Sequence, residues 1–363
     1  MPSINVHTGP GGQEEVTRVM IIDDSPLMCR AIENILEEDP SIKVAGCAHS
    51  GPEALDMLQE RACDICTLDV HMPGMNGITV LKHIMVKHPL PTLMVSAFTA
   101  DGARITFDAL RYGAVDFFQK PSSAGGKDLE AQADVLRNKV KTAAKVQVEA
   151  ARYLRLKLVS RKEKSAEATD SDRMSVNIIS TSTGGYSSLL SLLPSIDPAL
   201  SDPILVFMGV SDEVLSAFMD YLGSYVKLPV KRAADGQEMR PGTIYFLGNN
   251  ECAAFDQHGG RWRINVSVRQ DLPGREGPVD LALLSASEHF GQDARAIFLS
   301  GDEEQGFTGA RELLRNGGSV LIQRPATCLS PAVPQQILTE LDDVGAREVT
   351  LPEMAAIISK SDR

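Results

Sequence analysis

Five polar residues in the first third of the chain each close or follow a short apolar run. They are Asp23, Asp24, Asp69, Ser96 and Lys120, in the segments VMIIDDSP, TLDVHMPG, TLMVSAF and VDFFQKP. Carboxylates held close together repel one another, and a hard divalent cation such as Mg²⁺ relieves that repulsion by taking oxygen ligands. Asp69 could then attack a phosphoryl donor, while Lys120 stabilises charge on the phosphoryl oxygens and Ser96 contributes a hydroxyl. These residue types therefore indicate a phosphorylation switch.

The apolar runs themselves are typical of buried parallel strands. Amphipathic segments such as residues 28–36 lie between them, so the order is strand, helix, strand. That alternation predicts a parallel sheet with right-handed crossovers. Ligands on such sheets bind at the carboxyl ends of the strands, where we expect the five polar residues to meet. Each residue alone also has a structural explanation, such as a helix cap or a turn. The complete set of five favours a phosphorylation site.

Residues 17–125 resemble the receiver domain of two-component response regulators, on the basis of IIDDSP, LDVHMPGMNG, VSAF and QKP. The resemblance implies a flavodoxin-like fold and phosphorylation of Asp69 by a chemotaxis-type histidine kinase. It implies Mg²⁺ ligands at Asp23, Asp24, Asp69 and the main-chain carbonyl of His71, and switch residues at Ser96, Phe117 and Lys120. The segment VSAFTADGARITFDALRYGAVDFFQKP is closer still to receivers of one branch, the chemotaxis protein-glutamate methylesterase (CheB) family.

Length and composition limit the class of protein. A chain of 363 residues with 43% hydrophobic content has room for two domains, each with a buried core. The net charge of −12 argues against a nucleic-acid surface, which needs clustered Lys and Arg. There is no run of about 20 apolar residues and no leader-like segment, so we expect no membrane insertion and a cytoplasmic location.

The cysteines do not indicate chemistry of their own. Six cysteines in a chain of this length suggest no disulfide framework. Cys63 and Cys66 have a C-x-x-C spacing, but it leads into a predicted strand, where residues i and i+3 point to opposite faces. We therefore interpret the cysteines as small buried apolar residues.

Changes in composition divide the chain into four parts. We predict a disordered tail over 1–16, the receiver domain over 17–125, a long helix and linker over 126–174, and a second domain over 175–363. Residues 127–158 have helical spacing, which suggests that the last receiver helix runs long. The following segment SRKEKSAEATDSDRM lacks apolar periodicity and is typical of a flexible connector.

The second domain opens with VNIISTSTGGYSSLLSLLPSI, which predicts a strand, a turn of small residues and a helix. Ser182 lies in the turn, where Gly184 and Gly185 permit tight backbone geometry and exposed amides at the helix start. An exposed serine there could attack an acyl group, because the amides could hold an oxyanion; an anion nest or a plain helix cap explains the motif equally well. Further strands are predicted at DPILVFMG, GTIYFLG, WRINVSV, ARAIFLSG and SVLIQ, which indicates a second doubly wound α/β domain.

Residues from about 176 to 358 resemble the methylesterase domain of the CheB family, through STGG, ADGQEMRPGTIYFLG, GPVDLALLSASEHFG and FLSGDEEQG. The resemblance implies a Rossmann-type fold and makes Ser182 the nucleophile of a Ser-His-Asp triad. The family's His falls on Met208 in this sequence, and its Asp falls on Gln305. Serine is a weak nucleophile without an adjacent base, so losing both partners is expected to cost several orders of magnitude in rate.

Other residues around the predicted site bear on the same question. Asp302, Glu303 and Glu304 would bring negative charge to the place where an oxyanion develops, which opposes the transition state. His289, on a helix that the family places near the site, is a candidate for a relocated base, although packing explains it better. His258, in a polar turn flanked by glycine, is expected to be exposed to solvent.

Two functions follow. The first is a response regulator phosphorylated on Asp69, with a second domain that kept the methylesterase fold, is catalytically impaired, and acts as a binding module in signalling. The second is an active protein-glutamate methylesterase and glutamine deamidase that acts on methyl-accepting chemoreceptors. The replaced triad favours the first, and the overall resemblance favours the second, so the sequence leaves open whether the protein is an enzyme.

Overall fold

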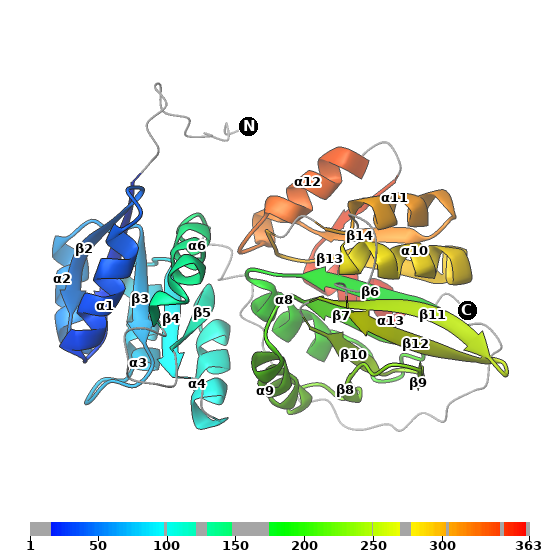
Figure 1. Cartoon of the computed structure of the whole chain (residues 1–363), viewed down its shortest axis with the longest axis horizontal. Helices are drawn as coiled ribbons and strands as arrows, with labels where there is room; N and C mark the ends of the chain where they lie inside the picture. Colours follow the sequence, from blue (N-terminus) through cyan, green and yellow to red (C-terminus); the bar gives the residue numbers. More distant parts are fainter. Residues whose placement is uncertain are drawn as a thin grey trace.

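The computed structural model describes residues 16–97, 100–120, 129–146, 174–248, 250–268, 277–302, 305–341 and 345–360. Most of the predicted tail and much of the predicted linker therefore lie outside the described residues. Within those ranges the chain forms two α/β domains that lie side by side (Figure 1). No described helix is long and apolar enough to cross a membrane.

The first domain is built on a five-stranded parallel sheet in the order β2-β1-β3-β4-β5. Its strands are β1 (Thr17–Ile22), β2 (Ile42–Ala48), β3 (Ile65–Asp69), β4 (Thr92–Ala97) and β5 (Asp116–Lys120). Its helices are α1 (Pro26–Glu37), α2 (Gly51–Glu60), α3 (Gly77–Lys87), α4 (Ala100–Arg111) and α6 (Ala133–Ala144). This is the flavodoxin-like strand order, with a topological switch point between β1 and β3. The prediction for this domain is confirmed.

Local sequence explains where these helices begin. Ser25, Ser50 and Asn76 occupy the N-cap positions of α1, α2 and α3, and each side chain accepts a hydrogen bond from a first-turn N–H. Such caps satisfy donors that the helix itself leaves unpaired. Gly77 opens α3 for a steric reason: a Cβ there would lie 2.0 Å from the carbonyl oxygen of Asp69. The sequence NG after β3 therefore permits α3 to start directly against the strand end that carries Asp69.

The second domain contains a seven-stranded parallel sheet in the order β15-β14-β13-β6-β7-β10-β8. Its strands are β6 (Val176–Thr181), β7 (Ile204–Met208), β8 (Val230–Arg232), β10 (Ile244–Leu247), β13 (Ala294–Phe298), β14 (Ser319–Gln323) and β15 (Arg347–Val349). Its helices are α8 (Gly185–Leu192), α9 (Asp212–Gly223), α10 (Pro278–Phe290), α11 (Phe307–Arg315), α12 (Ala332–Leu341) and α13 (Leu351–Ser359). Short 3₁₀ turns lie at Leu193–Ser195, Gly291–Asp293 and Pro325–Thr327. A second doubly wound domain was predicted, and it is confirmed.

One sheet differs from the prediction. The segment WRINVSV forms a strand, but in a separate antiparallel sheet of β9 (Gln237–Glu238), β11 (Glu251–His258) and β12 (Arg261–Val268). Gly259 and Gly260 join β11 to β12 with φ of +61° and +78°, as a two-residue hairpin turn requires. The segment ECAAFDQH is too polar to resemble a buried parallel strand, so its role as the hairpin partner was missed.

The last receiver helix is shorter than predicted. It ends at Ala144, because the N–H of Lys145 bonds to the carbonyls of Thr142 and Ala143 and tightens the final turn. The helical spacing that continues to residue 158 therefore does not extend α6 without a break, and residues 147–173 lie outside the described part of the chain. The proposed limits of the four segments remain predictions.

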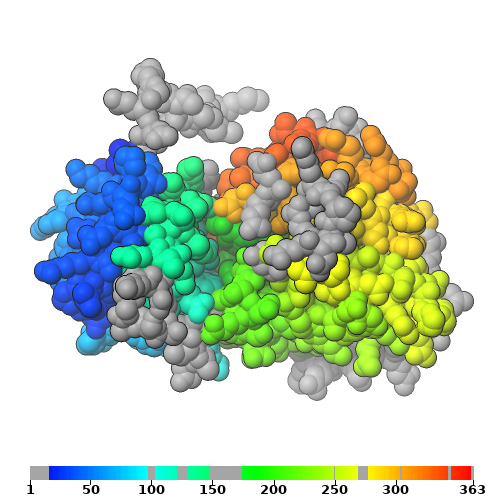
Figure 2. Space-filling model, in the orientation of Figure 1, coloured from blue at the N-terminus to red at the C-terminus, as the bar shows by residue number. Residues whose placement is uncertain are grey.

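The two domains contact each other through α4 of the first and α8 and α9 of the second. Figure 2 shows the first domain, coloured from blue to bluish green, packed against the second domain, coloured from green to red. The contact is apolar at its centre, and a single cluster of buried residues runs from the receiver core into the core of the second domain. Buried side chains of both domains therefore hold the two domains against each other.

Candidate functional site

The predicted phosphorylation residues meet at the carboxyl edge of the receiver sheet. Asp23 and Asp24 follow β1, Asp69 ends β3 and Lys120 ends β5. The Lys120 ammonium lies 2.7 Å from Asp23 Oδ2 and 3.1 Å from Asp69 Oδ1. Ser96 is buried near the end of β4, directly after Val95, which is the register partner of Asp69. The convergence expected from strand ends is what the structure shows.

Three carboxylates in this site could share a metal ion. One ligand oxygen each from Asp23, Asp24 and Asp69 lie within 4.8 Å of one another, and the described residues contain no other such group of His, Cys, Asp or Glu. The Lys120 cation offsets only part of the negative charge of these three carboxylates. Oxygen donors with excess negative charge suit a hard divalent cation, so the donor set fits a divalent metal site.

Burial sets the electrostatics of Asp69. Asp69 is 5% exposed, and burial raises the pKa of its carboxyl group, with a further increase from the charge of Asp23. The charge of Lys120 and the main-chain N–H of His71 act in the opposite direction. Burial alone would lower the pKa of Lys120, but Asp69 and Asp23 outweigh it, so the pKa of Lys120 is raised. Lys120 is therefore a cation at neutral pH.

The predicted switch aromatic is at the domain boundary. Phe117 is buried in β5, and its ring lies 5.9 Å from that of Phe107 and 5.3 Å from that of Tyr186 in the second domain. Exposed His71 follows Asp69 by two residues, and its carbonyl as a metal ligand remains a prediction. Phe117 thus contacts side chains of both domains.

Ser182 lies where the sequence predicted, in the turn between β6 and α8. Gly184 has φ of +77°, and a Cβ there would lie 2.6 Å from Ser300 Oγ, so both conformation and space require glycine. The Ser182 hydroxyl donates to Asp302 Oδ1 at 3.0 Å and accepts from the Asp302 N–H at 2.9 Å. A side chain at Gly301 would reach Ser182 Oγ at 2.6 Å. The loop after β13 therefore closes directly over the serine.

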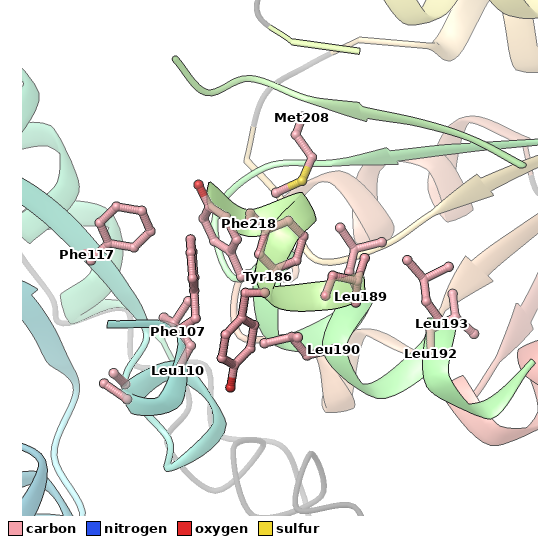
Figure 3. Packing of buried hydrophobic residues seen from close by; sticks show 14 of the residues in the cluster. Phe107, Leu110, Phe117, Tyr186, Leu189, Leu190, Leu192, Leu193, Met208 and Phe218 are labelled. Atoms are coloured by element: carbon pink, nitrogen blue, oxygen red, sulfur yellow. The ribbon is translucent and has the colours of Figure 1, made fainter. Parts of the chain in front are cut away.

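Neither Met208 nor Gln305 provides a base. Met208 ends β7 with a side chain only 2% exposed, and Figure 3 shows it directed toward Phe218 in the apolar cluster. Gln305 lies just before α11, with its Cβ against Gly277 at the start of α10. A thioether and an amide do not accept a proton from a hydroxyl at neutral pH. Glu303 and Glu304 lie outside the described residues.

The two histidines of the second domain have other contacts. The ring of His289 lies 5.8 Å from that of Trp262, in the last turn of α10. Asp280, in the first turn of the same helix, accepts a hydrogen bond from the Gly306 N–H, next to Gln305. His289 lies nine residues further along the helix, which is about 13 Å from Asp280 along the helix axis. His258 is exposed at the end of β11, beside the hairpin turn. The packing explanation therefore describes His289 better than a role as relocated base.

Sequence analysis missed a buried polar network that supports the Ser182 turn. Gln323, fully buried at the end of β14, accepts hydrogen bonds from the Ser188 hydroxyl and the Ser300 N–H, both at 3.0 Å. Ser300 Oγ donates in turn to the Thr183 carbonyl at 2.9 Å and accepts from the Ser330 N–H at 2.8 Å. A glutamine ending a buried apolar strand was the available signal, because such a residue needs partners.

Replacing Gln323 is expected to destabilise the second domain. Gln323→Leu keeps most of the volume but leaves two buried donors without an acceptor, at about 1–3 kcal/mol each. We expect the free energy of unfolding to fall by about 3 kcal/mol, measured by urea denaturation. The matched control is Gln335→Leu on the exposed face of α12, which should change it by less than about 0.5 kcal/mol. Equal effects of the two substitutions would contradict the role of the network.

Comparisons with known proteins match both domains. The model of the CheB methylesterase family matches residues 177–358, and the model of the response regulator receiver domain matches residues 19–130. A protein-glutamate methylesterase/protein-glutamine glutaminase of Pyrococcus abyssi is 32% identical over 88% of this chain and 86% of its own length. One from Thermotoga maritima is 31% identical over 90% of this chain and 94% of its own length. The solved response regulator domain of Thermotoga maritima CheB is 40% identical, covers 37% of this chain and 99% of its own, and aligns with a TM-score of 0.34.

Proposed function

Because this chain belongs to the CheB methylesterase family and also carries a receiver domain, we propose that it is a chemotaxis-type response regulator whose receiver is phosphorylated on Asp69. The observation that carries the proposal is the Lys120 ammonium held between Asp23 and Asp69. That arrangement places a fixed cation where a transferred phosphoryl group would carry its negative charge.

The residues have distinct roles in the proposed transfer. A carboxylate oxygen of Asp69 attacks the phosphorus of a phosphohistidine on a kinase, the phosphorus–nitrogen bond breaks, and the histidine nitrogen takes up a proton. Lys120 and the Ser96 hydroxyl bind the oxygens of the phosphoryl group on Asp69. Asp23, Asp24, Asp69 and the His71 carbonyl would hold Mg²⁺, which supplies further positive charge against those oxygens when bound. A cytoplasmic location suits both the kinase and this chemistry.

For the second domain we propose impaired esterase chemistry and a role as a binding module for chemoreceptors. The support comes from the residues around Ser182. The Ser182 hydroxyl donates to a carboxylate, Asp302, and a carboxylate is a much weaker base than an imidazole at neutral pH. The negative charge of Asp302 also stands beside the hydroxyl, where an oxyanion would form during acyl transfer. Met208 belongs to the hydrophobic core.

The second candidate is an active methylesterase and glutaminase, and the comparisons favour it more directly than they favour the first. The relatives that match most of this chain carry that activity in their names. In this function Ser182 would attack the carbonyl carbon of a methyl-esterified receptor glutamate, the ester bond would break, and methanol would leave with the serine proton. Water would then cleave the acyl-serine bond and release the glutamate carboxyl group. The two candidates share the receiver switch and differ only in what Ser182 does.

The binding function is tested by cosedimentation. Purified protein is mixed with membranes that contain methylated chemoreceptors, with and without beryllofluoride and Mg²⁺ as a phosphoryl mimic. The bound fraction is expected to rise with the mimic for the wild type and to stay constant for Asp69→Asn. If the protein does not bind the membranes with or without the mimic, or binds them equally in both cases, the proposal of phosphorylation-dependent receptor binding is wrong.

A further inference from the structure

One side of the receiver is basic in a chain that is acidic overall. Residues 70–100 contain no Asp or Glu, although the whole chain carries 48 acidic and 36 basic residues. Lys82 and Lys87 of this segment are exposed on α3. No carboxylate of the described residues forms an ion pair with either lysine, and this includes the carboxylates of neighbouring α2. The solvent side of α3 is therefore positively charged.

Apolar groups are exposed next to these lysines. The Val86 side chain, one turn after Lys82 on α3, is 71% exposed. Tyr112, just after α4, is 41% exposed, and the Lys82 ammonium lies 4.0 Å from the centroid of its ring. This cation–π contact joins α3 to α4 and orders both side chains. We name Lys82, Val86, Lys87 and Tyr112 the α3–α4 face; it combines two cations with an apolar and an aromatic group.

The α3–α4 face lies apart from the sites described above. Helix α4 lies between α3 and α9, so the second domain packs against the other side of α4 (Figure 1). Both α3 and α4 start at the carboxyl edge of the receiver sheet and run back across it, so Lys87 and Tyr112 lie toward the opposite edge from the phosphorylation residues. A partner could therefore bind this face without displacing the second domain or entering the phosphorylation site.

The charge and composition of the face select the class of partner. A nucleic acid needs many clustered cations, and the net charge of −12 repels it. An anionic membrane surface gains only about 1 kcal/mol per lysine near it, so two lysines bind it weakly. Carboxylates of a protein complement Lys82 and Lys87 directly, and an apolar side chain between them would cover Val86 and Tyr112. Tyrosine is also typical of protein interfaces, because it offers apolar area and a polar group together.

We propose that the α3–α4 face is a docking site for an acidic amphipathic helix of a partner protein. Lys82 and Lys87 are five residues apart on α3, about 7.5 Å along its axis. Carboxylates one to two turns apart on a partner helix match that separation. The ordering of Lys82 on Tyr112 lowers the entropy that binding would cost. This function requires neither phosphorylation of Asp69 nor esterase chemistry at Ser182.

A synthetic peptide tests the proposal with the full chain. The probe is a helical peptide of about 18 residues, with Leu and Glu on one face and Ala elsewhere. Amide NMR signals of the ¹⁵N-labelled protein are expected to shift in α3 and at residues 111–113. Lys82→Glu/Lys87→Glu should raise the Kd, measured by fluorescence anisotropy, by about tenfold or more. Lys43→Glu/Lys360→Glu is the matched control, because it changes net charge equally at two exposed lysines and should alter the Kd by less than about twofold.

Further probes test the apolar part of the face. Val86→Ser should raise the Kd about three- to tenfold, since it removes exposed apolar area that the Leu side chains would cover. A peptide with Ala in place of Leu should bind at least about tenfold more weakly, and one with Lys in place of Glu should not bind. Signal shifts centred outside α3 and residues 111–113, no shifts at all, or equal effects of the two double variants would overturn the proposal. Tighter binding to phosphatidylserine vesicles or to a DNA duplex would assign the face to a different partner and also overturn it.

Discussion

Asp69→Asn is expected to abolish phosphoryl transfer to this chain, both from acetyl phosphate and from a phosphorylated chemotaxis-type kinase. The amide that replaces the carboxylate has no negatively charged oxygen to attack phosphorus, and no other carboxylate in the site has the same neighbours. Asp23 is engaged by the Lys120 ammonium and by the Ser25 N–H at 3.0 Å. Loss of the attacking group removes the covalent step itself, so labelling should fall to background.

The measurement is incorporation of radiolabelled phosphate into the full-length chain in the presence of Mg²⁺. Asp64→Asn is the matched control, because Asp64 also lies at an end of β3 but is paired with Arg18 on the surface, at 2.8 Å. An exposed pair of this kind contributes about 1 kcal/mol or less, so this variant should label as the wild type does. Full labelling of Asp69→Asn would show that another residue accepts the phosphoryl group.

If the esterase chemistry is impaired as proposed, Ser182→Ala is expected to leave the rate of methanol release from methylated receptor membranes unchanged within about twofold, because neither Met208 nor Gln305 can take the serine proton. In a serine hydrolase with a complete triad, the same substitution costs about 10⁶ in rate. The two candidate functions therefore predict results that differ by several orders of magnitude. The assay uses protein treated with acetyl phosphate, so that the receiver is in its phosphorylated state.

A methylesterase of demonstrated activity serves as the positive control. Ser224→Ala serves as the matched variant, because Ser224 lies just after α9 and its hydroxyl donates to the Asp220 carbonyl. A wild-type rate more than tenfold above that of Ser182→Ala would establish the hydrolase function. In that case Asp302→Asn becomes the informative substitution. A further loss of rate would identify Asp302 as the group that accepts the serine proton.

The receiver site was predictable because its residues obey a local rule. Asp23, Asp69, Ser96 and Lys120 each lie at or near the carboxyl end of a parallel strand, and parallel order brings those ends to one edge. Only the strand and helix pattern is needed for that inference. The position of Ser182 followed from a similar local signal, a run of small residues between a strand and a helix.

The surroundings of Ser182 were not predictable in the same way. The DEEQ segment suggested negative charge near the site, but nothing in it indicated that Asp302 would both accept and donate a hydrogen bond with the serine hydroxyl. These two residues are 120 positions apart. The hairpin partner Glu251–His258 was missed for a related reason, since its polarity reflects one solvent-facing side that only the assembled sheet defines.

By itself, the sequence determined two parallel-sheet domains, the polar residues that meet at the carboxyl edge of the receiver sheet, and the turn that carries Ser182, because strand periodicity, caps and glycines act over a few residues. The tertiary structure alone decided that Tyr221 bonds to Asp108 across 113 residues and that Phe117 packs on Tyr186. Contacts between domains depend on which faces pack together after each domain has folded. The local sequence pattern around a single residue does not indicate which residue of the other domain it will contact. The way a phosphoryl signal could reach the second domain therefore lies in the packing and not in any motif.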